Sequence, residues 1–463
     1  EVHAQSFMDA DGTPAGVLAS CRPADDTVRT EAVLRRMATS DALTGLPNRR
    51  EIQQRFARHI PQGVAALFCD VDHFKSVNDT FGHAVGDAAI KHLVSVIEGF
   101  KRETDYLGRL GGDEFVLLIP DAPDCEHLQA IAAKLLACLK TPFVELGDGL
   151  LISASIGVAV LDHRSATAEA LMQHADVALY EAKGGGRAMV RLFDPDMQLQ
   201  LTQRAQLEER LRQALQRDEL TLHIQGVVDG EVRLCSAEAL MRWPQERDAW
   251  ISPDRFIPVA EESGLIHVLG DWSLQRLGAL MERWQGQMAA DFRIALNLSS
   301  SQFLHPDFER RLLERMRVAR LSCRRLKLEI TEATVLHDLG AAARRMESLR
   351  DQGISFSLDD FGTGYSSISY LRQLPLDEVK IDKSYVHNFL QNRSDAAVVS
   401  AVINLGSSLG ISVVAEGIQN EEQWQQLRAF GCNRFQGYLF SRPMEPTADL
   451  ESLLCARWRR PVG

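Results

Sequence analysis

The sequence predicts an α/β and α+β protein of at least two domains, and the second domain is predicted to be a (β/α)8 barrel. Its 463 residues are enough for two or three domains with full hydrophobic cores. In the second half, apolar strand-like runs alternate mostly with helical patterns, which favours parallel strands in a closed barrel. Eight such runs end near Gln225, Met241, Leu298, Ile330, Asp359, Ile381, Ala415 and Leu439.

The composition excludes some classes of protein. Hydrophobic residues make up 45% and charged residues 25% of the chain, as in ordinary soluble globular proteins. The formal charge of −12 argues against DNA bound through a broad basic face. The eight cysteines include no C-x-x-C pair, which favours reduced thiols and a cytoplasmic protein. We find no signal peptide and no apolar run of about 18 residues.

The first forty residues are expected to belong to a signalling region. Residues 1–24 alternate loosely around a turn at 9–12 and resemble the closing hairpin of a PAS sensor domain, although a disordered end of the chain is the alternative. Residues 25–40 have the pattern of a linker helix. Because the chain begins at Glu1, we expect an upstream sensory region to have been removed, and a membrane anchor in that region stays open.

Asp359 and Asp360 are the pair of residues at which we expect chemistry. They end the strand-like run 354–358 and open a glycine-rich turn. Two adjacent carboxylates raise each other's cost of ionising, and divalent cations remove that cost. Alone, the pair is as compatible with a solvated loop as with a metal site.

Polar side chains recur at or near the ends of the other predicted strands, which a barrel would bring to one rim. Any one of them alone is more often a helix cap or a solvated loop residue. Their arrival in phase with the strands favours a site for hard cations such as Mg²⁺ or Mn²⁺, because nearly all of them carry oxygen ligands. They are Gln225, Glu238, Asn297, Glu329, Asp359, Asp360, Lys380, Glu416 and Gln436.

The first half contains a second candidate site, between about residues 41 and 195. A buried strand, 64–72, carries Asp70 near its end, and two further strands are separated by the turn Gly111-Gly112-Asp113-Glu114. Glycines in such a turn allow a ligand to approach the backbone closely. Asp70 and Asp113 are placed to share a magnesium ion that holds a triphosphate, whereas the turn alone is more often an ordinary hairpin.

This segment resembles a GGDEF diguanylate cyclase domain, which implies a central, mostly antiparallel sheet. The motifs that carry the resemblance are Asp41 to Arg50, Phe74 to Asp87, Gly111 to Phe115 and Ala175 to Arg187. The resemblance implies metal binding by Asp70 and Asp113, with Glu114 in the catalytic turn. It further implies GTP binding by Lys75, Asn78, Asp87, Lys183 and Arg187, and an inhibitory product site at Arg102 and Asp105.

Such a cyclase joins two GTP molecules bound to two facing domains, so it needs a dimer. Binding of GTP needs no dimer, and the domain is therefore expected either to make cyclic di-GMP or to sense GTP for its neighbour. Residues 196–217 are predicted to form a connecting helix, a stiff joint that suits coupling.

Residues 218–463 resemble an EAL cyclic di-GMP phosphodiesterase over their whole length. The motifs include Glu238 to Trp243, Asn297 to Ser299, Glu329 to Glu332, Asp359 to Gly364, Lys380 to Asp382, Ala415 to Gly417 and Gln436 to Tyr438. The resemblance implies one metal on Glu238, Asn297, Glu329 and Asp359, and a second on Asp359 and Asp360. Lys380 and Glu416 would orient or deprotonate the attacking water, while Gln225, Arg242 and Gln436 would contact the substrate. Glu332 would steady the loop that links metal binding to dimerisation.

The expected reaction is hydrolysis of cyclic di-GMP to linear pGpG with two metal ions, tuned by a GTP-binding first domain in a homodimer. A net cyclase, a bifunctional enzyme and a silent cyclic di-GMP receptor are the alternatives. Gly226, Ser236 and Gln419 depart from the family pattern, and Gln419 is expected to weaken activity or metal affinity.

Overall fold

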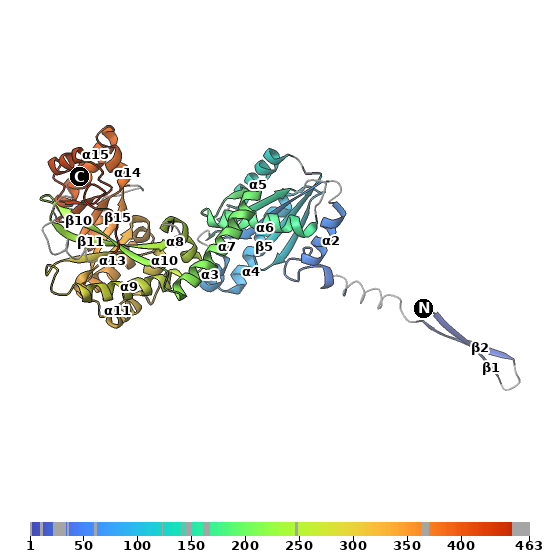
Figure 1. The fold of residues 1–463 in the computed structure, drawn as a ribbon. Coiled ribbons are helices and arrows are strands. Elements are labelled where there is room, and N and C mark those ends of the chain that lie inside the picture. The colour runs from blue at the N-terminus through green and yellow to red at the C-terminus, as the bar shows by residue number, and fades with distance from the viewer. Residues whose placement is uncertain are drawn as a thin grey trace. The chain divides into compact units, whose positions relative to one another are not determined.

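The computed structural model describes residues 2–9, 13–21, 34, 37–59, 63–122, 124–140, 142–143, 150–160, 167–245, 249–362 and 370–446. They form two compact units, Glu1–Gln203 and Arg204–Gly463, and each is described by itself (Figure 1). The predicted N-terminal hairpin is present as β1 (Val2–Met8) and β2 (Pro14–Cys21), which pair antiparallel. Most of the predicted helix at 25–40 lies outside the described residues.

The first unit is built on a five-stranded sheet that is antiparallel except at one edge, as predicted. In spatial order its strands are β4 (Tyr106–Gly111), β5 (Glu114–Pro120), β3 (Val64–Val71), β8 (Ala154–Val160) and β9 (Val190–Leu192), and only β8 and β9 pair parallel. A second, two-stranded sheet consists of β6 (Pro142–Phe143) and β7 (Leu150–Leu151). The helices are α2 (Arg49–His59), α3 (Phe74–Phe81), α4 (His83–Phe100), α5 (Cys125–Leu139) and α6 (Ala168–Gly184).

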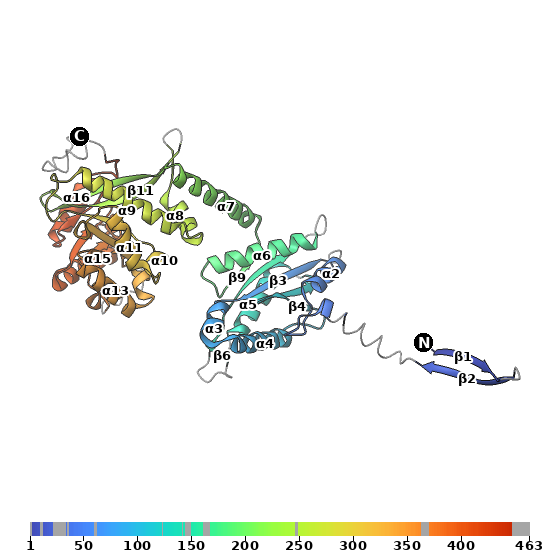
Figure 2. The same cartoon turned by 90° about the horizontal axis from the view of Figure 1, so that it is seen from below.

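The central strand β3 is buried on both faces, which explains its continuous apolar sequence. Its alternate residues Ala65, Leu67 and Cys69 pack with α4 and α5. The intervening residues pack with α2 and α6 on the other face (Figure 2). The acidic end of β3 is therefore held on a rigid, fully packed strand.

The connecting helix is α7 (Pro195–Gln216), and the division between the two units falls within it. In its second half, Leu207, Leu211 and Ala214 are buried against Trp243 and Phe256 of the second unit. This half of the helix therefore packs as part of the core of the second unit.

The second unit is a closed barrel of eight strands with one short extra strand at its rim. In spatial order, pairing runs β10, β18, β17, β16, β15, β14, β13, β11 and β12, and β10 also pairs with β11, which closes the barrel. The strands are β10 (Thr221–Asp229), β11 (Leu234–Pro244), β12 (Trp250–Ile251), β13 (Arg293–Asn297), β14 (Leu326–Thr331), β15 (Ser355–Phe361), β16 (Glu378–Ile381), β17 (Ser412–Ala415) and β18 (Arg434–Phe435).

Helices surround this barrel. They are α8 (Pro253–Glu262), α9 (Ile266–Arg283), α10 (Ser300–Phe303), α11 (Phe308–Val318), α12 (Glu332–Leu336), α13 (Leu339–Asp351), α14 (Lys383–Asn388), α15 (Arg393–Leu409) and α16 (Glu421–Ala429), with short 3-10 turns η3 (Cys323–Arg325) and η4 (Leu371–Gln373). No helix of the described residues is both long and apolar enough to cross a membrane.

Two details of the barrel differ from the prediction. The first strand, β10, is antiparallel to both of its neighbours, because only a short turn joins it to β11 and such a turn reverses the chain. The last strand ends at Phe435, not near Leu439. Among the apolar residues after Phe435, Phe440 is buried in the main core and Met444 forms an isolated antiparallel bridge with Ile224.

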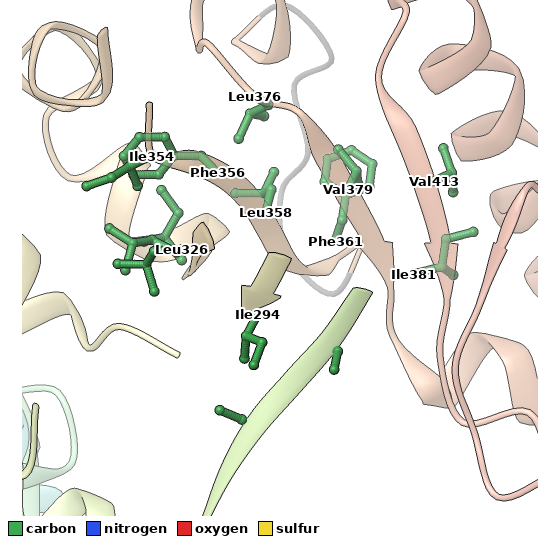
Figure 3. Close-up of a cluster of buried hydrophobic side chains, with 14 of the residues drawn as sticks. Ile294, Leu326, Ile354, Phe356, Leu358, Phe361, Leu376, Val379, Ile381 and Val413 are labelled. Atoms are coloured by element: carbon green, nitrogen blue, oxygen red, sulfur yellow. The ribbon is translucent and has the colours of Figure 1, made fainter. Parts of the chain in front are cut away.

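Alternation along the strands separates an apolar layer from a polar interior. Leu328, Val379 and Ile381 belong to the apolar core between strands and helices, part of which Figure 3 shows. The residues between them, including Glu329 and Lys380, point to the opposite side because strand side chains alternate. The same alternation brings charged side chains into the barrel.

Candidate active site

Lys380 lies at the centre of a ring of four carboxylates at the carboxyl rim of the barrel. Its Nζ is 2.6 Å from Glu416 Oε1, 2.8 Å from Glu329 Oε2, 3.3 Å from Glu238 Oε2 and 3.5 Å from Asp359 Oδ1. The lysine side chain is 2% exposed. Four acids that are far apart in the sequence are therefore brought within reach of one atom.

Each member of this ring comes from a different strand or from the residue directly after one. Glu238 lies on β11, Glu329 on β14 and Asp359 on β15, and Glu416 follows directly after β17. Parallel register aligns them: Asn297 pairs with Glu329, and Thr331 pairs with Asp359. The predicted convergence of these residues on one rim is what the structure shows.

The charges of the ring shift one another's pKa values. Burial alone would lower the pKa of Lys380, but the surrounding carboxylates hold it well above its ordinary value, so this residue stays an ammonium. Burial raises the pKa of Glu416 to about 7, and burial together with Glu238 raises that of Glu329 well above its usual range. Burial also acts on Glu238, but Lys380 and hydrogen bonds outweigh it and lower its pKa.

Two amide side chains hold Glu238 in place, and a third, that of Gln225, contacts one of them. Asn297 Nδ2 donates to Glu238 Oε1 at 2.7 Å, and Gln436 Nε2 donates to Glu238 Oε2 at 2.7 Å. Gln436 Nε2 also lies 3.1 Å from Gln225 Oε1, while Gln225 Nε2 donates to the Ser441 carbonyl. Gln225 and Gln436 are both buried and hydrogen-bonded within the protein, an arrangement suited to positioning Glu238. The sequence motifs did not predict this role.

A cavity of about 470 Å³ opens beside the ring. Its lining includes Arg242, Glu261, Asn297, Asp359 and Asp360. Burial lowers the pKa of Arg242, whose Nη1 donates to the Met241 carbonyl. The predicted substrate contact Arg242 is thus placed on the wall of this cavity.

Asp360 lies at the cavity but outside the ring around Lys380. Its backbone φ of 56° is left-handed, a conformation that L side chains seldom adopt, and the strand register shifts there. Burial and the neighbouring Asp359 raise the pKa of Asp360. Glu332 is buried at the start of α12, whereas the loop 363–369 that it was expected to steady lies outside the described residues.

The donor set at this rim fits hard cations. Asp359 Oδ1 is buried and accepts no hydrogen bond from the described residues, so it has lone pairs left for a cation. The described residues contain no group of three or more His, Cys, Asp or Glu side chains with the geometry of a metal site. The fit therefore depends on the chemistry of the donors, which are carboxylate and amide oxygens.

The first unit holds a smaller acidic centre at the end of β3. Asp70 is buried, and Lys183 from α6 pairs with it at 2.7 Å. Burial raises the pKa of Asp70 to about 6, and Asp113 and Glu114 add to this effect by repulsion. Glu114 itself lies 3.7 Å from Arg49 Nη2. The strand β3 and the turn after β4 thus bring Asp70 near Asp113, as predicted.

The predicted GTP contacts are exposed, except for Asn78 and Lys183, which are half-buried. Asn78 lies against Gly86, where any Cβ would clash with its Oδ1, so Gly86 allows Asn78 to approach the helix that carries Asp87. Arg187 is exposed in a left-handed backbone conformation with φ 62°. Among the described residues, the ion pairs of the acidic centre are made by Lys183 and Arg49, and neither Lys75 nor Arg187 forms one there.

Arg102 and Asp105 form a turn rather than an ion pair. The Arg102 backbone N donates to Asp105 Oδ2 at 2.8 Å, and the Asp105 backbone N donates to the Arg102 carbonyl. Asp105 is buried, and its Oδ1 has no hydrogen-bond partner among the described residues. The prediction of an inhibitory product site at this pair stays a prediction.

Two anchoring residues in the first unit were missed by sequence reasoning. Asp72 accepts hydrogen bonds from Ser153, Ser155 and the Ala188 backbone, and so ties the loop after α6 to β3. Arg109 binds Asp41 and the Gly112 carbonyl, which links the opening turn to the glycine turn. Their acidic and basic character was visible, but their partners lie up to 116 residues away.

The fold and the site define a two-domain chain with an acid-rich barrel rim and a separate acidic hairpin site. Comparison with family models matches residues 38–189 to the "Diguanylate cyclase, GGDEF domain" and residues 208–443 to the "EAL domain". The chain therefore belongs to the EAL domain family and carries a GGDEF domain before its EAL domain.

Two relatives and one solved structure are informative. The bifunctional diguanylate cyclase/cyclic di-GMP phosphodiesterase MucR of Pseudomonas aeruginosa is 38% identical over 93% of this chain and 64% of its own. The cyclic di-GMP phosphodiesterase PdeR of Escherichia coli is 32% identical over 91% of this chain and 64% of its own. The chain thus spans less than two thirds of these relatives. The structure of the PaMucR phosphodiesterase with c-di-GMP matches 53% of this chain and 99% of that one, with 40% identity and a TM-score of 0.51.

Proposed function

We propose that the EAL domain hydrolyses cyclic di-GMP to linear pGpG in a reaction that depends on two divalent ions, Mg²⁺ or Mn²⁺. The observation that carries this proposal is the gathering of Glu238, Glu329, Asp359 and Glu416 around one buried lysine. Relatives named as cyclic di-GMP phosphodiesterases, and a similar domain solved with c-di-GMP, support the choice of substrate.

The residues divide into ion-binding and proton-handling groups. Glu238, Asn297, Glu329 and Asp359 would hold one ion, and Asp359 and Asp360 the second. When bound, such ions polarise the phosphate and lower the pKa of a water molecule. Asn297 would present its amide oxygen after a half-turn about its terminal bond, exchanging the hydrogen bond to Glu238 for an ion contact.

Lys380 and Glu416 act on the attacking water. Because Lys380 stays protonated, its role is to hold the carboxylates together and to donate a hydrogen bond, not to accept a proton. Glu416, with a pKa of about 7, is the better acceptor for the proton of the attacking water. Arg242 contacts the substrate phosphate from the cavity wall, and Gln225 and Gln436 keep Glu238 oriented.

The GGDEF domain, in this proposal, binds GTP with Mg²⁺ and regulates the EAL domain. Asp70 and Asp113 provide the carboxylates for the ion, with Glu114 beside them, and Lys183 is placed to move from Asp70 to the triphosphate. Lys75, Asn78, Asp87 and Arg187 complete the nucleotide site. The protein acts as a homodimer, in which Glu332 links the metal site to the dimer contact.

The test is incubation of the full chain with cyclic di-GMP and Mg²⁺ or Mn²⁺, and separately with GTP, followed by chromatography. We expect pGpG from cyclic di-GMP, no product in the presence of EDTA, and a loss of at least a hundredfold for Glu329→Gln. If GTP yields cyclic di-GMP and cyclic di-GMP yields no pGpG, the assignment is overturned in favour of a net cyclase. Absence of both products would leave a cyclic di-GMP receptor.

A second candidate is a bifunctional enzyme that also makes cyclic di-GMP. The intact turn from Gly111 to Glu114 next to buried Asp70 favours it, because these are the groups that a cyclase would use on magnesium and GTP. The relative MucR is named as bifunctional. Appearance of both pGpG and cyclic di-GMP in the two incubations would support this candidate.

A further inference from the structure

We propose that a small cavity between α9 and α11 of the EAL domain binds a short-chain aliphatic carboxylate. The cavity measures about 50 Å³ and is distinct in chemistry from the phosphate site described above. Its inner lining includes Leu274, Leu312 and Leu328, all of them buried. Four half-buried residues of the lining carry nitrogen donors in their side chains, so the cavity combines an apolar wall with polar groups; they are His267, Gln302, His305 and Arg311.

Arg311 supplies a positive charge at this cavity. It makes no ion pair with any described residue, whereas its neighbours on α11 are both paired. Arg310 lies 3.5 Å from Asp307 and 3.7 Å from Glu314, and Arg315 lies 3.0 Å from Asp271. Asp271, the one acid among the described residues that line the cavity, thus already has an ion-pair partner in Arg315. An anion at the cavity would meet the uncompensated guanidinium of Arg311.

Two histidines add hydrogen-bond capacity around the cavity. His267 and His305 stand edge to face, with ring centroids 5.4 Å apart. His305 Nδ1 accepts a hydrogen bond from the Asp307 backbone N at 3.1 Å, so its Nε2 carries the proton and is a donor. Burial and the charge of Arg311 lower the pKa of His267, which leaves Arg311 as the main cation of the cluster. One guanidinium and one imidazole donor suit a carboxylate.

The volume limits the ligand. One water molecule needs about 10–15 Å³ of such space, so 50 Å³ has room for about three carbon-sized groups. Butyrate matches this, with its propyl chain against the leucines and its carboxylate at Arg311. Inorganic phosphate fits worse, because oxygens pressed against buried leucines would lose hydrogen bonds.

The cavity lies behind the catalytic rim. It shares Leu296, Asn297 and Leu298 with the larger cavity, and Asn297 is an expected metal ligand. The carboxylate site does not depend on that function. Binding can be measured without metal or nucleotide, so failure of one proposal leaves the other standing.

The test is calorimetric titration of the full chain with butyrate, together with saturation-transfer NMR. Butyramide is the matched probe, since it has the same shape without charge, and hexanoate tests the length limit. We expect butyrate to bind, butyramide and hexanoate to bind at least tenfold more weakly, and Arg311→Gln to weaken butyrate at least tenfold. Arg310→Gln is the control, with the same charge change outside the cavity, and should leave butyrate binding unchanged.

The proposal is overturned by an absence of butyrate binding to the unaltered chain, or by equal binding of butyramide. It is also overturned if Arg310→Gln and Arg311→Gln weaken binding equally, because that result would reflect net charge alone. The comparison of butyrate with butyramide uses the unaltered chain and decides the question even if Arg311→Gln does not fold.

Discussion

The two domains both pair a lysine with buried carboxylate, but they do so in opposite ways. Lys380 lies on a strand, is 2% exposed and faces four carboxylates. Lys183 lies in the last turn of α6, is 36% exposed and faces one carboxylate, Asp70. The barrel lysine is therefore locked into the architecture, whereas the lysine of the GGDEF domain is free to exchange its partner for a ligand.

The difference arises because a strand inside a barrel and the end of a helix hold a lysine side chain in different ways. A strand inside a barrel fixes its inward side chain by packing on every side, at the cost of burying charge. A helix end leaves the long lysine chain in contact with water, so its ion pair contributes little to stability. Substitutions at the two lysines should separate these behaviours.

The largest effect is expected for Lys380→Met. Four carboxylates would remain without their shared cation, and loss of one partner of a buried pair costs about 3–5 kcal/mol. Urea unfolding in the presence of a chelator measures the loss, and hydrolysis of cyclic di-GMP should fall below detection. Lys327→Met, which breaks the buried 2.7 Å pair with Glu378, is the control: it should destabilise but spare hydrolysis in the protein that stays folded. An undiminished stability of Lys380→Met would contradict the comparison.

Lys183→Met should weaken the binding of GTP and should have little effect on the stability of the fold. The free energy of unfolding should change by less than about 1 kcal/mol, because the pair with Asp70 is partly exposed. Affinity for GTP with Mg²⁺ should drop about tenfold, as measured by calorimetry. Lys91→Met, on an exposed face of α4, is the matched control and should leave affinity unchanged. A stability loss as large as that of Lys380→Met would show that Lys183, too, contributes mainly to the stability of the fold.

Asp70→Asn tests how the stability of the GGDEF domain depends on pH through this buried carboxylate. Burial raises the pKa of Asp70 from 3.8 to about 6, so the folded state binds the proton more tightly than the unfolded state. The stability associated with this proton is complete below pH 3.8 and is lost as the pH rises through 6. The neutral Asn variant should therefore be more stable than the original chain at pH 8, with the gap closing toward pH 4. Thermal unfolding of both proteins between pH 4 and pH 8 measures this difference in stability. A difference that grows toward low pH would contradict the prediction.

The smallest effect is expected for Gln419→Glu. The structure places the exposed Gln419 side chain 3.3 Å from His387 Nε2, on α14, and not in the ring around Lys380. A glutamate there would form an exposed pair with His387 worth less than about 1 kcal/mol. We expect a change of less than twofold in the metal concentration needed for hydrolysis. A larger change in metal requirement would restore the expectation that Gln419 weakens the metal site.

Much of the fold follows from patterns that are local in the sequence. Apolar runs with β-periodicity predicted six of the eight strands in the barrel to within three residues of their observed ends, and the glycine turn predicted the hairpin of β4 and β5. The antiparallel entry of β10 and the early end of β18 at Phe435 were missed. Both depend on how the chain closes the barrel, and no local pattern encodes closure.

The members of the site were predictable, but their contacts were not. Acids at the carboxyl ends of predicted strands predict a shared site, because parallel strands end at the same rim of the barrel. That Lys380 would sit between the acids, or that Gln436 would bond to Glu238 across 198 residues, depends on side-chain positions in the packed interior. Arg102 and Asp105 show the same limit: their spacing was visible in the sequence, but the hydrogen bond from the Arg102 backbone N to the Asp105 carboxylate was not.

The closure of the barrel bears on how the protein is made. Ile224 exchanges two backbone hydrogen bonds with Met444, and β10 pairs with β18. One edge of the first barrel strand therefore stays unpaired until the last segment of the barrel has been synthesised. A ribosome must release more than two hundred residues beyond Ile224 before this seam forms. Until then a nascent chain presents an open sheet edge, which invites aggregation and calls for chaperone protection.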